Sequence, residues 1–452
     1  MQAFKNGSNF WRARAVALGL LVAAVTPLSS QAQNIRQYDF GTGTVAEGYT
    51  QVTATNYYSD SAGFGFDYSS IPLAFNRRGL ADPLQSDFAT GLGPFFFSTK
   101  IPMGNYQVTV TLGDALKPSS TTIKAESRRL FIPEIHTRPG EFKTVSFNVG
   151  LRDSMITANR AVLINQREYQ KLDWDNKLTI EFNGQRPVVN AITIQKIKDP
   201  IQVFLMGNST VTDQSLEPWA SWGQMLPAFF NSDRVVVHNM AASGETLRSA
   251  LGRRRLEGVA AMLHKGDYVF IEFAHNDQKE GSGEKAYTTY NQYLKTYADT
   301  VRAHGAIPVF VTSTCRRSFG ADGKLVNTLG DFPAAMRYEA KKEQITLLDL
   351  NLMTKTLYEA YGVERSKDLF VQFAPGTFAG VSRDLADNTH FCDFGAYELA
   401  KCMVELIKSS DLELKHQFRR DLKAFDPKHP DRIEDFELPL TPMFSQIKPL
   451  GS

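Results

Sequence analysis

The sequence lacks several features that define large classes of proteins. Its 50 basic and 48 acidic residues leave a net charge of only +2, so there is no basic excess to neutralise the phosphates of a nucleic acid. It contains no Gly-x-x-x-x-Gly-Lys phosphate loop and no His-Glu-x-x-His zinc helix. The Gly-x-Ser-x-Gly elbow of α/β-hydrolases is also missing. We therefore expect no nucleic-acid partner, no metal and no cofactor.

Long hydrophobic runs are scarce, and the one near the beginning is short. A basic start precedes an apolar stretch over residues 15–25, which is too short to span a bilayer comfortably. Ser30-Gln31-Ala32 then matches the small-x-small pattern of a signal-peptide cleavage site. We predict a signal peptide over residues 1–32, so the mature protein is secreted or periplasmic and free of the membrane.

Cysteine is also rare, with only Cys315, Cys392 and Cys402. Export permits disulfides, and an odd count leaves one thiol over. A helix between Cys392 and Cys402 would separate them by about 15 Å, which is beyond bridging range. Two possibilities stay open: a Cys315–Cys392 disulfide, if both lie at the same end of a parallel sheet, or three free thiols.

The first half of the chain has the pattern of short, one-sided strands. Apolar and polar residues alternate over residues 106–112, 143–149 and 178–182, and turns rich in Gly and Pro separate such stretches. Many short strands of this kind predict an all-β sandwich or jelly-roll domain over residues 33–198.

The pattern changes near Pro200, where apolar runs begin to alternate with helical stretches. Strands are expected over 201–206, 234–238, 268–273, 307–313 and 345–349, and helices over 221–230, 247–264, 285–304, 351–361 and 393–408. This alternation predicts an α/β domain over residues 199–410, with a parallel sheet covered on both faces. The polar, Pro-rich residues 411–452 are expected to form an extended tail packed along the domain, with disorder as the alternative.

Ser209 follows the first of these strands, in Gly207-Asn208-Ser209-Thr210. Ligands bind beyond the carboxyl ends of strands in such sheets. A tight turn leading into a helix would expose the hydroxyl and aim the serine N–H at a developing oxyanion. A serine is a poor nucleophile until a base takes its proton. Taken alone, a serine in this position is more often a helix cap.

Asp387 and His390 can supply that base. Three residues apart in a turn, the carboxylate can hydrogen-bond the imidazole and fix its tautomer, leaving the other ring nitrogen free to accept the serine proton. Gly244, in a glycine turn, and Asn276, after a predicted strand, can donate hydrogen bonds to an oxyanion. Each residue alone has an ordinary role in turns or caps. Together they are the parts needed for acyl transfer through a serine ester.

Four ordered motifs then resemble those of SGNH (GDSL-like) hydrolases, most closely the rhamnogalacturonan acetylesterases. The motifs are Gly207-Asn208-Ser209-Thr210-Val211-Thr212, Glu217-Pro218-Trp219-Ala220-Ser221-Trp222-Gly223, Glu272-Phe273-Ala274-His275-Asn276-Asp277 and Asp387-Asn388-Thr389-His390-Phe391. The resemblance implies a flavodoxin-like three-layer hydrolase domain that removes acetyl groups from pectic polysaccharide without a metal.

The resemblance also implies the role of each site residue. Ser209 is the nucleophile, His390 the base and Asp387 its orienting acid. The oxyanion hole is formed by Ser209, Gly244 and Asn276. Two positions depart from the family: Asn208 replaces the usual Asp, and Ala274 replaces the usual Gly. Neither departure removes a catalytic group.

The front domain looks like the galactose-binding-like sandwiches attached to such esterases, through residues 38–41 and 63–67. It either binds sugar or braces the catalytic domain, and bracing is the favoured interpretation. Arg316 and Arg317 follow a strand and could meet a uronate carboxylate, although surface charge is the more ordinary reading. The sequence does not determine the oligomeric state.

Two further functions remain open from sequence. One is a lipid or aryl esterase on the same scaffold, which preference for long acyl chains would reveal. The other is a carbohydrate-binding protein with an inactive esterase domain, which the departures at Asn208 and Ala274 suggest. Binding of pectin without hydrolysis of any acetate ester would reveal it.

Overall fold

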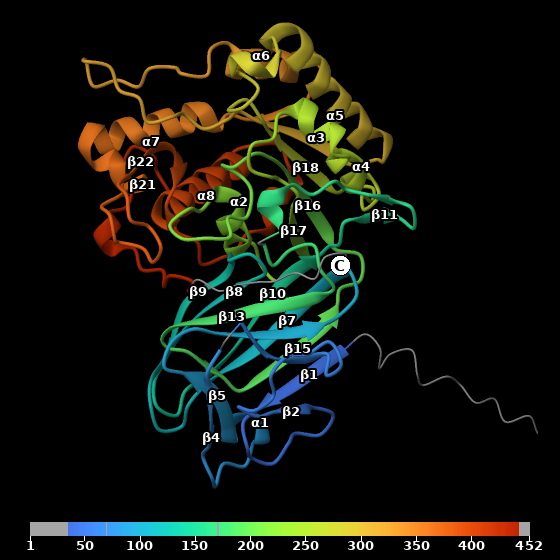
Figure 1. Ribbon diagram of the computed structural model, residues 1–452, viewed down its shortest axis with the longest axis vertical. Coiled ribbons are helices and arrows are strands. Elements are labelled where there is room, and N and C mark those ends of the chain that lie inside the picture. Colours follow the sequence, from blue (N-terminus) through green and yellow to red (C-terminus); the bar gives the residue numbers. More distant parts are fainter. Residues whose placement is uncertain (1–34, 69, 170, 443–452) are drawn as a thin grey trace, which may run out of the picture. The chain divides into compact units, whose positions relative to one another are not determined.

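A computed structural model of the protein describes residues 35–68, 70–169 and 171–442 (Figure 1). The predicted signal peptide over residues 1–32 and the last ten residues of the predicted tail lie outside this range. No helix of the described residues is long and apolar enough to cross a membrane.

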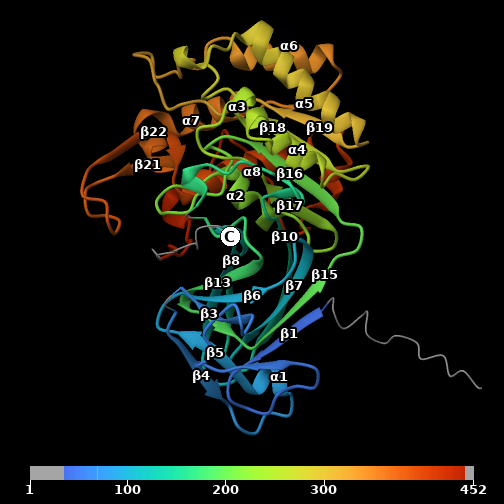
Figure 2. The same cartoon turned by 45° about the vertical axis from the view of Figure 1, so that its right-hand side comes forward.

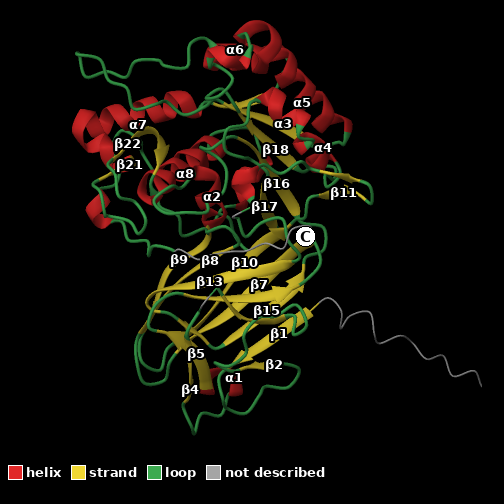
Figure 3. Ribbon diagram, in the orientation of Figure 1, coloured by secondary structure: helices red, strands yellow, loops and turns green. Residues whose placement is uncertain are grey.

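The first half of the chain forms a β-sandwich, whose strands are yellow in Figure 3. Two five-stranded sheets have the orders β10-β7-β15-β1-β2 and β3-β6-β13-β8-β9, and a smaller sheet has the order β14-β5-β4. The bounds are β1 (Ile35–Phe40), β2 (Thr50–Val52), β3 (Phe64–Asp67), β4 (Pro72–Asn76), α1 (Pro83–Ser86), β5 (Asp87–Gly91), β6 (Phe95–Lys100), β7 (Gly104–Gly113), β8 (Ser119–Ala125), β9 (Arg129–Thr137), β10 (Phe142–Leu151), β11 (Met155–Thr157), β12 (Arg160–Ala161), β13 (Lys177–Arg186), β14 (Val188–Val189) and β15 (Ala191–Lys196).

Alternating apolar side chains fill the space between the two large sheets. In β7 every second residue from Tyr106 to Leu112 is buried, and these side chains pack on Phe97, Ile180 and other inward residues of the opposite sheet. One apolar face per strand is what the sequence pattern predicts for a sandwich.

The second half is built on a parallel sheet with the order β17-β16-β18-β19-β20. In chain order this is 2-1-3-4-5, the flavodoxin-like arrangement. The strands are β16 (Ile201–Gly207), β17 (Val235–Asn239), β18 (Tyr268–Glu272), β19 (Ile307–Val311) and β20 (Thr346–Leu348), with an antiparallel pair of β21 (Phe370–Phe373) and β22 (Leu385–Phe391) beside them. The predicted fold class, a flavodoxin-like α/β domain preceded by an all-β domain, is confirmed.

Helices cover both faces of this sheet and make three layers. They are α2 (Trp222–Met225), α3 (Leu247–Gly252), α4 (Arg255–Ala260), α5 (Asn291–Ala303), α6 (Phe332–Lys342), α7 (Leu350–Arg365) and α8 (Asp393–Lys408). On one face, alternate strand residues such as Leu205 pack with α2, α7 and α8. On the other face, residues such as Phe204 and Met206 pack with α3, α4, α5 and α6. The two groups of helices separate in Figures 1 and 2.

Several sequence-based expectations for the helices are corrected by the structure. The helix expected over 221–230 is α2 followed by a 3₁₀ turn, in which Pro227 has no N–H to continue the α-helix. The helix expected over 247–264 breaks into α3 and α4 at Arg254, whose φ of 60° is left-handed. The helix expected over 285–304 begins with a π turn. Helix α6 and the β21–β22 pair were not predicted.

The possible Cys315–Cys392 disulfide does not form, and all three cysteines are free. Each thiol of that pair has its own neighbour: Cys315 Sγ donates to Asn351 O at 3.3 Å, and Cys392 Sγ donates to Asp368 O at 3.1 Å. Burial raises the pKa of Cys315 to about 11 and that of Cys392 to about 12.

Buried charges join the β-sandwich to the α/β half of the chain. Arg128 pairs with Glu217 and with Asp393, and Arg129 Nε lies 3.2 Å from Asp213 Oδ2. Lys171 Nζ donates to Thr212 Oγ1 at 2.6 Å, three residues after Ser209. Charges buried in this way must be paired, because an unpaired buried charge is strongly destabilising. The sandwich therefore contacts the segment that follows Ser209.

The C-terminal residues 411–442 form 3₁₀ turns at Glu413–Gln417 and Ile433–Asp435 and are otherwise irregular. Phe418 stacks on Phe230, with ring centroids 4.8 Å apart. Further on, Thr441 Oγ1 donates to Glu181 Oε2 of β13 at 2.9 Å. This segment thus packs first on the α/β half and then on the sandwich.

Candidate functional site

Ser209 lies just beyond the carboxyl end of β16, the strand between β17 and β18. The N–H groups of Val211 and Thr212 both donate to Asn208 O and close a single turn around the serine. The expected helix does not follow, since the next one begins at Trp222. Ser209 is nevertheless confined, with 9% of its surface exposed.

His390 contacts Ser209, although the two residues lie near opposite ends of the second half of the chain. Its Nε2 lies 2.8 Å from Ser209 Oγ, and its Nδ1 lies 2.7 Å from Asp387 Oδ2. Nδ1–H donates to the carboxylate, so Nε2 is the nitrogen that can accept the serine proton. The structure therefore brings together the three residues for which the sequence predicts nucleophile, base and acid.

The Asp387–His390 segment is a bulge of β22 and not the free turn that the sequence suggested. Phe391 pairs with Phe370 and Ala386 with Gln372, so four residues of β22 stand opposite one residue of β21. Such bulges re-aim side chains next to active sites. Here the bulge turns both the carboxylate and the imidazole toward β16.

Backbone hydrogen bonds fix the carboxylate in the bulge. Asp387 Oδ1 accepts the N–H of Thr389 at 2.8 Å and that of His390 at 3.0 Å. Burial alone would raise the pKa of Asp387, but the hydrogen bonds from His390 and from these N–H groups outweigh it and lower the pKa. The carboxylate is thus ionised when it faces the imidazole.

Hydrogen bonds link the loops of the other predicted donors, Gly244 and Asn276, to each other and to the end of β16. Ala242 N donates to Gly207 O at 3.2 Å, which ties the loop carrying Gly244 to the end of β16. Gly244 has φ of 87°, a conformation that favours glycine. Asn276 Nδ2 donates to Glu245 O at 3.0 Å, and its Oδ1 accepts from Lys279 Nζ at 2.7 Å. Because an amide nitrogen carries two hydrogens, one N–H of Asn276 is left for a further acceptor.

Beneath the serine turn lies a polar network that sequence reasoning missed. Asn208 Oδ1 accepts from the N–H and the hydroxyl of Thr210. The Thr210 hydroxyl also lies 3.0 Å from Glu272 Oε1, and Trp222 Nε1 donates to Glu272 Oε2 at 2.7 Å. Burial raises the pKa of Glu272 to about 7. The available signal was a glutamate inside the apolar run of β18.

The two other residues of the His275-Asn276-Asp277 motif hold the loop in place. His275 Nε2 donates to Thr314 O at 2.8 Å, and burial lowers the pKa of His275 to about 3, so the ring is neutral. Asp277 Oδ1 accepts the N–H of Leu247 at the start of α3. Ala274, the departure from the family pattern, is buried in the core on that face of the sheet.

Arg316 and Arg317 are partly buried, and both are hydrogen-bonded within the chain. Arg316 donates to His275 O at 3.1 Å and to Thr328 O at 3.2 Å. Arg317 donates to Asn388 Oδ1 at 3.0 Å, and its own N–H donates to Asn388 O. The second arginine therefore braces the bulge that carries His390, a role that neither sequence interpretation foresaw.

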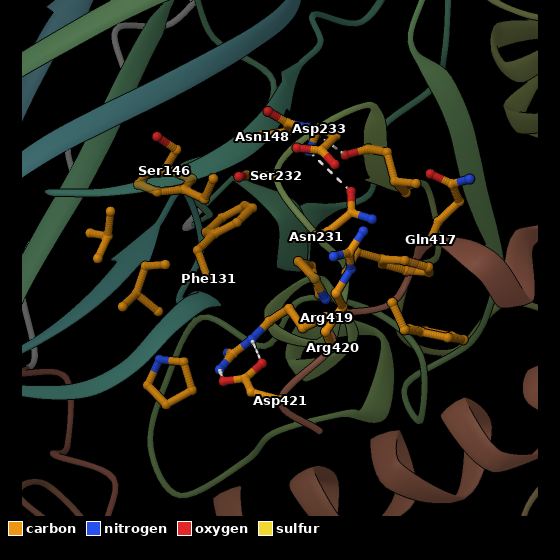
Figure 4. Close-up of a pocket in the computed structure, with 18 of the residues that line it drawn as sticks. Phe131, Ser146, Asn148, Asn231, Ser232, Asp233, Gln417, Arg419, Arg420 and Asp421 are labelled. Carbon is orange, nitrogen blue, oxygen red and sulfur yellow. Dashed lines mark hydrogen bonds and ion pairs between the residues drawn. The ribbon is translucent and has the colours of Figure 1, made fainter. Parts of the chain in front are cut away.

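A large cavity lies elsewhere and does not include these residues. It measures about 780 Å³ and lies between β9, β10 and the C-terminal segment, where Ser146, Asn231 and Arg420 are among its lining residues (Figure 4). Among its polar lining residues, Arg419 Nη2 donates to Asp421 Oδ2 at 2.6 Å. The candidate site is therefore identified by its hydrogen bonds and not by a large cavity. Among the described residues, no group of three His, Cys, Asp or Glu is placed to hold a metal ion.

Comparisons with known proteins agree with the motifs. Residues 205–375 match the GDSL-like lipase/acylhydrolase family. Residues 36–132 match the domain described as beta-agarase/YXIM esterase-like, galactose-binding domain-like. The resemblance expected from the sequence is confirmed for both halves.

Individual proteins are also similar to this chain. The rhamnogalacturonan acetylesterase RhgT of Bacillus subtilis is 46% identical over 221 residues, which cover 48% of this chain and 94% of that protein. The uncharacterized esterase YxiM of the same organism is 23% identical over 411 residues, covering 88% of this chain and 97% of that protein. The solved structure of the Bacillus subtilis YxiM protein covers 83% of this chain and 98% of its own, with 23% identity and a TM-score of 0.44.

Proposed function

We propose a specific reaction for this chain, which belongs to the GDSL-like lipase/acylhydrolase family and is a carboxylic ester hydrolase. We infer that it removes O-acetyl groups from a pectic polysaccharide through Ser209, His390 and Asp387. The observation that carries this proposal is the pair of hydrogen bonds from Ser209 Oγ to His390 Nε2, 2.8 Å, and from His390 Nδ1 to Asp387, 2.7 Å.

In the first half of the reaction, Ser209 Oγ attacks the acetyl carbonyl while His390 Nε2 takes the hydroxyl proton. Ionised Asp387 stabilises the imidazolium that forms. The oxyanion accepts hydrogen bonds from the N–H groups of Ser209 and Gly244 and from the remaining N–H of Asn276. His390 then gives its proton to the departing sugar oxygen, which leaves an acetyl-serine.

In the second half, a water molecule takes the place of the sugar hydroxyl. His390 accepts a proton from this water as it attacks the acetyl-serine, and the same three donors hold the second oxyanion. Collapse of this intermediate returns the proton to Ser209 Oγ and releases acetate. The chain's own side chains supply every proton transfer in this scheme.

The substrate part of the proposal rests on the relatives. RhgT, named as a rhamnogalacturonan acetylesterase, is 46% identical across nearly its whole length, and a second Bacillus subtilis protein named a probable rhamnogalacturonan acetylesterase is 31% identical over 94% of its length. This likeness supports acetylated pectic polysaccharide over a lipid or aryl ester. The basic start, short apolar run and cleavage pattern of residues 1–32 support export, where such a polymer is met.

The proposal is tested by acetate release from acetylated rhamnogalacturonan, with p-nitrophenyl acetate and p-nitrophenyl octanoate as simple esters. We expect acetate from the polymer and a faster rate on the acetate ester. Ser209→Ala should lose all activity and keep its melting temperature, while Ser409→Ala, an exposed serine after α8, should match the parent. A faster rate on octanoate would contradict the sugar substrate, and an active Ser209→Ala would contradict the nucleophile.

A further inference from the structure

A short turn from the β-sandwich half lies beside the loop that carries Gly244. The turn is the 3₁₀ segment Gln166–Glu168. A methyl group built on Gly244 would lie 3.6 Å from Arg167 Nη1, so the guanidinium lies over the glycine backbone. The first half of the chain thus places an arginine next to one of the three proposed oxyanion donors.

The turn is held rigidly by its own ends. Asn165 Oδ1 accepts the N–H of Arg167 at 3.0 Å, and Glu168 Oε2 accepts the N–H of Asn165 at 2.8 Å. This reciprocal capping fixes the backbone on both sides of Arg167. The side chain of Arg167 therefore starts from a defined position.

One buried arginine anchors both the turn and the glycine loop. Arg255 of α4 forms an ion pair with Glu168, and its Nη1 donates to Met240 O at 3.3 Å, where the loop toward Gly244 begins. Burial alone would raise the pKa of Glu168, but the positive charges of Arg255 and Lys171 and the hydrogen bonds to the carboxylate together outweigh it and lower the pKa. Glu245, next to Gly244, is also buried and lies 3.0 Å from Arg253 Nε. These contacts fix Arg167 relative to the proposed oxyanion hole.

The charge of Arg167 is available to a ligand. Its side chain is exposed, and its guanidinium has no hydrogen bond or ion pair with residues 35–442 as far as these are described. Beside another of the proposed donors, the exposed Lys279 Nζ donates to Asn276 Oδ1 at 2.7 Å. The acids next to Arg167 and Gly244 in the chain, Glu168 and Glu245, are buried and already paired with arginines, so they leave the charge of Arg167 uncompensated at the surface.

We propose that Arg167 is a substrate-binding residue contributed by the N-terminal domain, and that it binds a carboxylate of a uronate unit beside the acetylated sugar. The inference rests on the proposed function and names the class of polymer that this site prefers, an anionic one. A guanidinium suits this task because it binds a carboxylate through two parallel hydrogen bonds. Lys279 adds a second positive charge that attracts the same chain.

The experiment compares three substrates across four proteins at low and high salt. The substrates are acetylated rhamnogalacturonan oligosaccharide, acetylated xylo-oligosaccharide without uronate, and p-nitrophenyl acetate. The proteins are the parent chain, Arg167→Ala, Arg167→Lys and the control Arg78→Ala, which removes an exposed arginine after β4. Melting temperatures verify that all four are folded.

For Arg167→Ala we expect kcat/KM on the anionic oligosaccharide to fall about 10- to 100-fold, mainly through KM. Its rates on the neutral oligosaccharide and on p-nitrophenyl acetate should stay within twofold of the parent. Arg167→Lys should recover part of the loss, and the parent's advantage on the anionic substrate should shrink in high salt. Arg78→Ala should behave as the parent does.

Two results would overturn the inference. An unchanged KM on the anionic oligosaccharide would show that Arg167 does not bind it. An equal loss on all three substrates would show that Arg167 acts on the oxyanion or on the loop instead. Both leave the proposed function standing, because that proposal fails only if the parent chain releases no acetate from acetylated rhamnogalacturonan.

Discussion

Replacement of Asp387 by asparagine should disable His390 without disturbing the fold. Asp387 Oδ1 accepts two backbone N–H groups, from Thr389 and from His390. Asn at this position must present its oxygen to those donors, so its NH₂ group replaces Oδ2 and points at His390 Nδ1. Nδ1 must then accept a hydrogen bond, and the imidazole proton moves to Nε2.

That tautomer is wrong for catalysis. Nε2–H would face Ser209 Oγ at the 2.8 Å separation seen here and could no longer take its proton. Trapping the wrong tautomer lowers turnover by about 10⁴-fold, equivalent to about 5.4 kcal/mol of transition-state stabilisation at 1.36 kcal/mol per tenfold. The loss should fall on kcat, because no contact to substrate changes.

The assay is steady-state and burst kinetics with p-nitrophenyl acetate, for the parent, for Asp387→Asn and for a matched control. Asp384→Asn removes the same charge from an exposed position just before β22 and should keep full activity. Melting temperature should be unchanged in both variants. A loss of less than tenfold in Asp387→Asn would refute the argument that two backbone donors dictate the orientation of the amide.

Two other changes test the neighbouring residues. Asn276→Ala should keep KM and lower kcat by about 10²- to 10³-fold, because one oxyanion donor is lost; full activity in steady-state assays would remove Asn276 from the hole. Asp277→Asn addresses stability, since burial raises the pKa of Asp277 from 3.8 to about 7. Between these values the unfolded chain has lost a proton that the folded chain keeps, so stability falls as pH rises. Asp277→Asn should reduce this loss of stability by up to about 4 kcal/mol between pH 4 and 8, as measured in denaturant titrations. An identical dependence of stability on pH in the parent and the variant would refute this role for Asp277.

The sequence predicted the strands and helices correctly where the hydrophobic periodicity is strong. Helix α8 begins and ends where the pattern predicts, and the five strands of the parallel sheet shift by at most two residues at either end. The pattern failed where local backbone chemistry decides. Arg254 adopts a left-handed φ that divides one predicted helix into two, and neither hydrophobic period nor composition encodes that break.

The sequence predicted the residues of the candidate site, but not the contacts that hold them in position. Ser209, His390 and Asp387 carry distinctive chemistry, and their neighbours in the chain make motifs. The bulge that orients His390 depends on pairing between β21 and β22 and on Arg317, which is distant in sequence. Arg167 has no motif at all, because its position arises from the capped turn and from the ion pair between Glu168 and Arg255.

The amino-acid sequence alone determined which chemical groups are present and where the five parallel strands and α8 lie along the chain, since both follow from residue identity and local periodicity. The tertiary structure decided which groups meet. The approach of a residue from β22 to one after β16, and of an arginine from the sandwich to Gly244, depends on long-range strand pairing and buried ion pairs. Those contacts join segments far apart in the chain, and no local pattern records them.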